Sequence, residues 1–216
     1  MERLEITTRE HEERVAALKQ VLESAGFAAM CVFGPTRVSY LTGFHFAATE
    51  RPVALVVPVD GDPHILIPRL EMDHVRQQAR QLEHVRTYPE YPGGGSGKHP
   101  LHHLQDLLVD IGVANARLTA DLDGYEHRWG YRGPPLSQVL GRAVATHLEF
   151  IDDLRIVKSP AEVALVREAC VWGDRAHRAM QDLMVEGASE LAVSQTASMA
   201  TTAEMLERLG ERYVPK

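Results

Sequence analysis

The sequence predicts a three-layer α/β domain with a mixed sheet, followed by a region made only of helices. Strand-like and helix-like segments alternate over residues 1–150, which is typical of helices that cover both faces of a sheet. A short Asp-Gly-Asp turn at residues 60–62 joins two of the strand-like segments and predicts an antiparallel pair. From Ser159 onward there are two long helical patterns and no strand signal. We therefore place one domain at residues 1–154 and the start of another at residues 155–216.

A helix and a buried strand open the first domain. Thr7 and Glu10 have the spacing of a capping box, and Gly26 is placed to end the helix in a left-handed conformation. One face of this helix carries the apolar residues Val15, Leu18, Leu22 and Ala25. The nearly all-apolar run at residues 27–33 predicts a buried strand that stops at Gly34-Pro35.

The later elements of the first domain continue the alternation. Further strands are predicted at residues 52–58, 64–68, 84–88 and 117–121. Helices are predicted at residues 70–82, 100–111 and 136–144. The helix at 100–111 shows the clearest pattern, because Leu101, Leu104, Leu108 and Ile111 form one stripe that Gly112 ends.

Composition excludes several classes of partner. The net charge of −7 and a pI of 5.9 argue against a nucleic-acid partner, which normally requires a basic surface. There is no run of 18 apolar residues and no signal-peptide core, so we expect no membrane partner. The two cysteines, Cys31 and Cys170, are too few for a disulfide framework and are predicted to be buried and reduced. These observations predict a cytoplasmic protein.

Three segments, in this order, carry a family resemblance. Residues 38–44 read Val-Ser-Tyr-Leu-Thr-Gly-Phe, residues 153–162 contain Arg, Lys-Ser-Pro and Glu, and residues 187–190 read Gly-Ala-Ser-Glu. In the second segment Ser159 is a predicted N-cap, with a proline at the first helical position and a capping-box glutamate. Together they resemble the creatinase, prolidase and aminopeptidase P superfamily of M24-type metallopeptidases. The resemblance implies a creatinase N-terminal-like domain followed by the first helices of a truncated "pitta-bread" catalytic domain.

The resemblance also implies an activity. Members of the superfamily are Xaa-Pro peptidase-like metallohydrolases, in which two divalent ions (Mn, Zn or Co) activate a water molecule that attacks a peptide or small amide. The ligands are two Asp, one His and two Glu on later strands, and the sequence stops at Lys216 before them. We therefore expect no catalytic residue, no metal ion and no hydrolysis from this chain alone. Its expected roles are homodimerisation and shaping of the substrate cleft.

Substrate-binding candidates come from the same resemblance. In the creatinase-like members an arginine and an aromatic residue of this domain help to hold the substrate in the partner subunit. Arg51 lies at the comparable place, and His45 and Phe46 lie on the same connecting loop. A guanidinium suits a substrate carboxylate because it can bind both oxygens. The alternatives are a salt bridge at a strand edge for Arg51 and a structural loop position for His45.

Other chemistry has weaker support. Histidines at residues 99, 102 and 103 with Asp106, or Asp174 with His177, could contribute to a zinc site, but no HExxH pattern occurs. The glycine-rich residues 93–98 lack the spacing of a phosphate-binding loop and favour a surface loop. Cys31 in an apolar run should have a raised thiol pKa and be unreactive.

Two other classes of protein remain possible. One is a non-catalytic module of aminopeptidase-like fold that binds a peptide or a protein. The other is an unrelated α/β domain, against which the order of the three segments argues.

Overall fold

The structure is a computed structural model that describes residues 5–90, 97–125 and 133–210. The chain divides into two compact units, one formed by Ile6–Val157 and the other by the segment from Lys158 onward.

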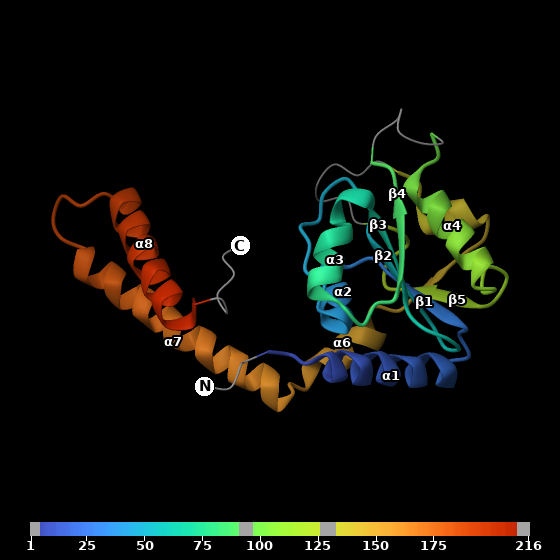
Figure 1. Ribbon diagram of the computed structural model, residues 1–216, viewed down its shortest axis with the longest axis horizontal. Helices are drawn as coiled ribbons and strands as arrows, with labels where there is room; N and C mark the ends of the chain where they lie inside the picture. Colours follow the sequence, from blue (N-terminus) through green and yellow to red (C-terminus); the bar gives the residue numbers. More distant parts are fainter. Residues whose placement is uncertain (1–4, 91–96, 126–132, 211–216) are drawn as a thin grey trace. The chain divides into compact units, whose positions relative to one another are not determined.

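A mixed six-stranded sheet forms the centre of the first unit (Figure 1). Its strands are β1 (Ala29–Val32), β2 (Ala54–Pro58), β3 (His64–Pro68), β4 (His84–Tyr88), β5 (Leu118–Ala120) and β6 (Ala145–Thr146). Their order across the sheet is β4-β3-β2-β1-β5-β6. β2 is antiparallel to both β1 and β3, whereas the β3–β4, β1–β5 and β5–β6 pairs are parallel. The predicted hairpin around residues 60–62 is therefore confirmed.

Helices cover both faces of this sheet. One face packs on α1 (Thr8–Ser24), α2 (Pro35–Thr42), α3 (Met72–Gln78) and α6 (Glu149–Ile156). The opposite face packs on α4 (Pro100–Asp110) and α5 (Leu136–Leu140). Figure 1 shows α2 and α3 on one side of the strands and α4 on the other. The predicted three-layer α/β arrangement is confirmed.

The central strand β1 shows why the 27–33 run is apolar throughout. Met30 and Val32 face the core beneath α1 and α2, whereas Ala29 and Cys31 face the core beneath α4. A strand buried on both faces needs no polar alternation. Burial also raises the pKa of the Cys31 thiol to about 12, as the sequence predicted.

Two of the predicted helices are shorter in the structure than their sequence patterns indicate. The helix predicted at residues 70–82 consists of a 3₁₀ turn, η1 (Arg69–Glu71), followed by the short α3. The helix predicted at 136–144 ends at Leu140, because Gly141 adopts a left-handed conformation with φ of 65°. Ala145 and Thr146 then pair with β5. At α1, Thr7 caps the helix as predicted, but the Glu10 carboxylate is bound by Arg14.

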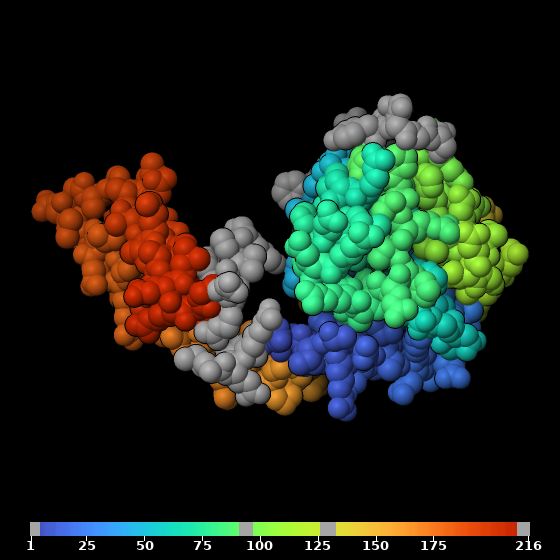
Figure 2. Space-filling view, in the orientation of Figure 1, coloured from blue at the N-terminus to red at the C-terminus, as the bar shows by residue number. Residues whose placement is uncertain are grey.

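The second unit contains a helical hairpin of α7 (Pro160–Leu183) and α8 (Glu190–Leu209). α7 begins with the predicted capping box between Ser159 and Glu162. The orange α7 and the red α8 lie against each other in Figure 2. Trp172 of α7 and Ala197 of α8 are buried, whereas Cys170 is exposed, so the prediction that Cys170 is buried is wrong. Cys170 is two positions before the buried Trp172, and with about 3.6 residues per turn this places the two side chains on nearly opposite sides of α7. None of the described helices is long and apolar enough to cross a bilayer.

Candidate functional site

The loop between α2 and β2, residues 43–53, carries all three predicted substrate-binding residues. Gly43 starts the loop in a left-handed conformation with φ of 76°. A Cβ atom at this position would lie 2.9 Å from Nε2 of His11, so both the backbone and the space require glycine. The His11 Nδ1–H donates to the Tyr40 carbonyl at 3.0 Å. The start of the loop is therefore fixed to α1.

Two tyrosines from other elements hold the end of the loop. Tyr88, on β4, donates its hydroxyl to the Pro52 carbonyl at 2.8 Å. Tyr125, after β5, is 5% exposed and belongs to the core beneath α4. Burial raises the pKa of Tyr125 to about 12, against the lowering effects of the Thr49 backbone and the Arg51 charge. Residues 49–52 are thus supported by two different parts of the sheet.

Arg51 has an unusual set of contacts. Its side chain is 26% exposed, so most of its length is covered. The Thr49 hydroxyl oxygen accepts from the Arg51 backbone N–H and from Nε, both at 3.3 Å. The Glu50 carboxylate lies 3.6 Å from Nε. Among the described residues no hydrogen bond is recorded to the two terminal guanidinium nitrogens of Arg51. This end of the guanidinium can therefore accept an anionic ligand.

His45 and Phe46 have other neighbours. The Ser39 hydroxyl lies 2.8 Å from Nδ1 of the exposed His45. The Phe46 ring stacks on the buried ring of Phe44 with their centroids 5.2 Å apart. These contacts differ from those of Arg51, and the structure places all three residues on one loop.

A buried charge cluster nearby was not predicted from the sequence. Asp121, at the end of β5, accepts from the backbone N–H groups of Phe33 and Gly34, each at 2.8 Å. Burial raises the pKa of Asp121, although these donors and Arg37 act to lower it. Arg37 also binds both oxygens of Asp152, at 3.0 and 2.7 Å. Because these groups join the ends of strands and helices, we assign them a structural role.

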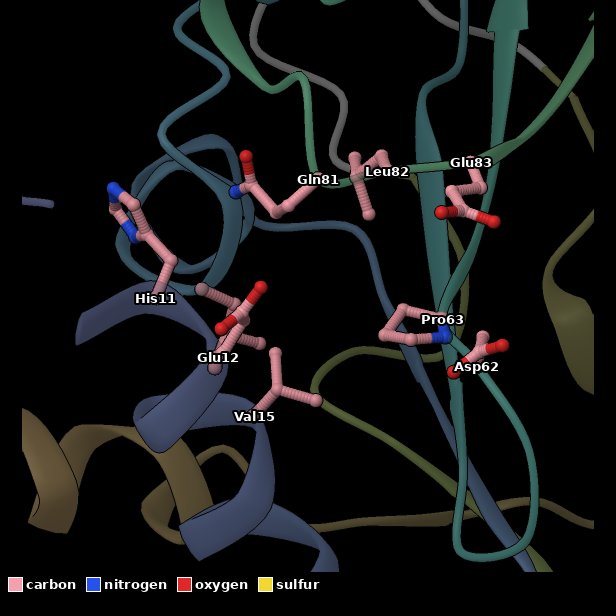
Figure 3. Close-up of a pocket in the computed structure, with 9 residues that line it drawn as sticks. His11, Glu12, Val15, Asp62, Pro63, Gln81, Leu82 and Glu83 are labelled. Atoms are coloured by element: carbon pink, nitrogen blue, oxygen red, sulfur yellow. The ribbon is translucent and has the colours of Figure 1, made fainter. Parts of the chain in front are cut away.

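A hollow of about 310 Å³ lies between α1, the β2–β3 turn and the connection from α3 to β4 (Figure 3). Carboxylates of Glu12, Asp62 and Glu83 line it. Figure 3 shows Glu12 rising from α1 on one side, with Asp62 and Glu83 on the other. No three histidine, cysteine or acidic side chains among the described residues converge enough to hold a metal ion, here or elsewhere.

The weaker candidates of the sequence analysis have local partners. His99 caps α4 by accepting from the Leu101 N–H, and Asp106 pairs with Lys98. His103 stacks near Tyr88, with ring centroids 6.3 Å apart. Residues 93–96 of the glycine-rich loop lie outside the described residues. The described residues therefore do not fit the two ions that the resemblance implies, and we derive no reaction step through them.

Comparison with known proteins places this geometry in context. The family model of the creatinase/prolidase N-terminal domain matches residues 14–157. A probable dipeptidase PepE of Mycobacterium bovis is 27% identical over 191 residues, covering 88% of this chain and 48% of that protein. The crystal structure of dipeptidase PepE from Mycobacterium ulcerans matches with a TM-score of 0.69 and 28% identity, covering 92% of this chain and 51% of that one.

A more distant structure shares the fold alone. It is the prolidase from Pyrococcus horikoshii, with a TM-score of 0.65 and 16% identity, covering 89% of this chain and 49% of that one. The chain spans about half the length of the curated relatives it matches.

Proposed function

The chain belongs to the creatinase/prolidase N-terminal domain family, and from this premise we propose that it is the N-terminal portion of a Xaa-Pro dipeptidase-like metallohydrolase. Sequence relatives that cover most of this chain are named as dipeptidases, which supports a peptide substrate. The observation that carries the proposal is Arg51, whose side chain is mostly covered on a supported loop and whose terminal nitrogens make no hydrogen bond among the described residues. Such a group suits the carboxylate of a dipeptide, because charge-assisted hydrogen bonds to two oxygens are strong and directional.

We propose that substrate binding and hydrolysis depend on residues in different parts of the enzyme. The described residues offer a group that can bind the substrate carboxylate, whereas the hydrolytic chemistry needs groups elsewhere in the enzyme. We propose that two divalent ions (Mn, Zn or Co) supply an activated water there. We further propose that the enzyme is a cytoplasmic homodimer in which this domain shapes the substrate cleft. His45 and Phe46 stay candidates for contact with the rest of the peptide.

The proposal is tested by hydrolysis of Ala-Pro with Mn²⁺, with and without a chelator. The protein from its complete coding region should be active and should lose activity with the chelator, whereas the 216-residue chain should be inactive. Hydrolysis by the 216-residue chain that manganese restores after chelation would contradict our assignment of the metal chemistry to other residues. Absence of metal-dependent hydrolysis in the complete protein would favour a non-catalytic peptide- or protein-binding module.

The role of Arg51 is tested separately in the complete protein. Arg51→Ala should raise KM for Ala-Pro by about 10- to 100-fold, the range expected for lost hydrogen bonds to a charged group. KM for the amide of Ala-Pro, which lacks the carboxylate, should change little. The control is Arg9→Ala, because the Arg9 side chain is 85% exposed on α1 and pairs with Glu13. Equal effects on both substrates would show that Arg51 does not bind the carboxylate.

A further inference from the structure

The guanidinium of Arg51 offers a carboxylate two possible edges. One is the side edge, formed by Nε and one terminal nitrogen, and the other is the end, formed by the two terminal nitrogens. In this structure Nε donates to the Thr49 hydroxyl at 3.3 Å and lies 3.6 Å from the Glu50 carboxylate. Atoms of the chain itself therefore occupy the side edge, which leaves the end for a ligand.

The Thr49 hydroxyl is well placed to hold this arrangement. The same oxygen accepts from the Arg51 backbone N–H, so it links the main chain and the side chain of one residue. A hydroxyl that bonds the backbone two residues later forms a compact local turn. The neighbouring Pro52 carbonyl is fixed by Tyr88, and the buried Tyr125 lies beside the loop.

Restricting the Arg51 side chain before a ligand binds should raise the affinity for that ligand. A free arginine side chain loses considerable rotamer entropy when it is immobilised, and that loss weakens binding. If Thr49 already restricts the side chain, binding of a carboxylate immobilises less. The contact lies on the binding group and not on the reacting bond, so its effect should appear in KM and not in kcat.

We infer that Thr49 is a positioning residue that directs the end of the Arg51 guanidinium toward the terminal carboxylate of a peptide substrate. The inference rests on the proposed function for the identity of the ligand. The hydrogen bond itself can be measured without activity.

The first experiment measures the contact in the 216-residue chain. Hydrogen exchange of the Arg51 Nε–H is followed by NMR, with Arg51→Lys used to identify the signal. Thr49→Val, which replaces the hydroxyl with a methyl group of similar size, should speed exchange by about tenfold. Thr49→Ser should keep the wild-type rate, and Glu50→Gln should change it less than Thr49→Val. Unchanged exchange in Thr49→Val, or a larger effect in Glu50→Gln, would overturn the inference.

The second experiment measures the consequence in the protein from its complete coding region. Thr49→Val should raise KM for Ala-Pro by about tenfold with kcat nearly unchanged, and Thr49→Ser should restore the wild-type value. KM for the Ala-Pro amide should not move. A fall in kcat, or an equal rise in KM for both substrates, would show that Thr49 has only a general structural role.

The two experiments separate failure of the inference from failure of the proposed function. If the wild-type protein hydrolyses neither substrate, the proposed Xaa-Pro activity is wrong. Binding of Ala-Pro by calorimetry then replaces KM in the same variants. About tenfold weaker binding to Thr49→Val than to Thr49→Ser would still support the positioning role, and equal binding would overturn it.

Discussion

Replacing Asp121 tests how the strands of the first unit are connected. Asp121 is 1% exposed, and its carboxylate links the end of β5 to the end of β1. It follows β5, and its oxygens accept from the Phe33 and Gly34 N–H groups at the end of β1. Replacing Asp121 with alanine leaves both donors without this partner in a place that water cannot easily reach. The loss in free energy of unfolding should therefore be larger than that caused by removing an exposed carboxylate.

The size of the destabilisation follows from the two backbone N–H groups that lose their acceptor. A buried donor left without its partner costs about 1–3 kcal/mol, so two cost about 2–6 kcal/mol. Arg37 lies 3.5 Å from Asp121 but keeps its two bonds to Asp152, which limits the further loss. The expected destabilisation is therefore about 4 kcal/mol, a large part of the 5–15 kcal/mol typical of a domain.

The assay is urea unfolding by far-UV circular dichroism, with hydrogen exchange at the amide of Phe33 as the local measure. Asp123→Ala is the matched control, because the exposed Asp123 also accepts two hydrogen bonds, both from Ser137. It should cost no more than about 1 kcal/mol. If Asp121→Ala does not fold, Asp121→Asn, which keeps one acceptor, should fold with about half the loss. Equal losses for Asp121→Ala and Asp123→Ala would refute the reasoning.

Three further predictions concern other positions, the first with a matched control variant. Gly43→Ala should lower stability by about 2 kcal/mol or more in thermal melts, since it combines left-handed strain with a steric clash. Gly141→Ala has the same left-handed strain but no nearby atoms, so it should lower stability by about 1 kcal/mol. Equal losses of stability in the two variants would show that the steric clash at Gly43 contributes nothing. Hydrogen bonding from Arg37 lowers the pKa of Asp152 from its usual value of 3.8. The interaction between Arg37 and Asp152 therefore stabilises the folded protein above pH 4, and this stabilisation is lost as the pH falls and Asp152 becomes protonated in the folded protein. Asp152→Asn should flatten the pH dependence of urea midpoints below pH 4, and an unchanged slope would contradict this. Ser159→Ala should destabilise the first turn of α7 by about 1 kcal/mol and speed amide exchange there, whereas unchanged exchange would argue against the capping box.

Much of the fold was predictable because its central strands are marked by local composition. The 27–33 run and the two strands on either side of residues 60–62 are apolar on both faces, as strands covered by two helical layers require. In contrast, β6 has only two residues, both exposed, and exists because β5 is beside it. The eight-residue helix α6 likewise lacked a clear pattern, since Ile151 is its one buried residue among those described.

The candidate site was only partly predictable for a different reason. Arg51 could be proposed from the family resemblance, because it follows the residues 38–44 segment on the connection to the next predicted strand. The residues that hold its loop come from distant parts of the chain. Tyr88 is 36 positions from Pro52, and no local pattern links Tyr125 to Thr49. Tertiary packing decides where the loop is held, whereas the local contacts with Thr49 and Glu50 decide which edge of the guanidinium is available.

In the proposed function, the support of this loop allows substrate binding to be separate from the metal chemistry. A binding arginine needs a fixed direction more than it needs a reactive neighbour, and packing against a rigid sheet supplies that direction. The buried Tyr88 at the end of β4 and the buried Tyr125 after β5 connect residues 49–52 to the sheet. Arg51 and Thr49 should therefore act as one unit. Once Arg51 is alanine, replacing Thr49 with valine should have no further effect on Ala-Pro binding, because Thr49 then has no guanidinium to direct.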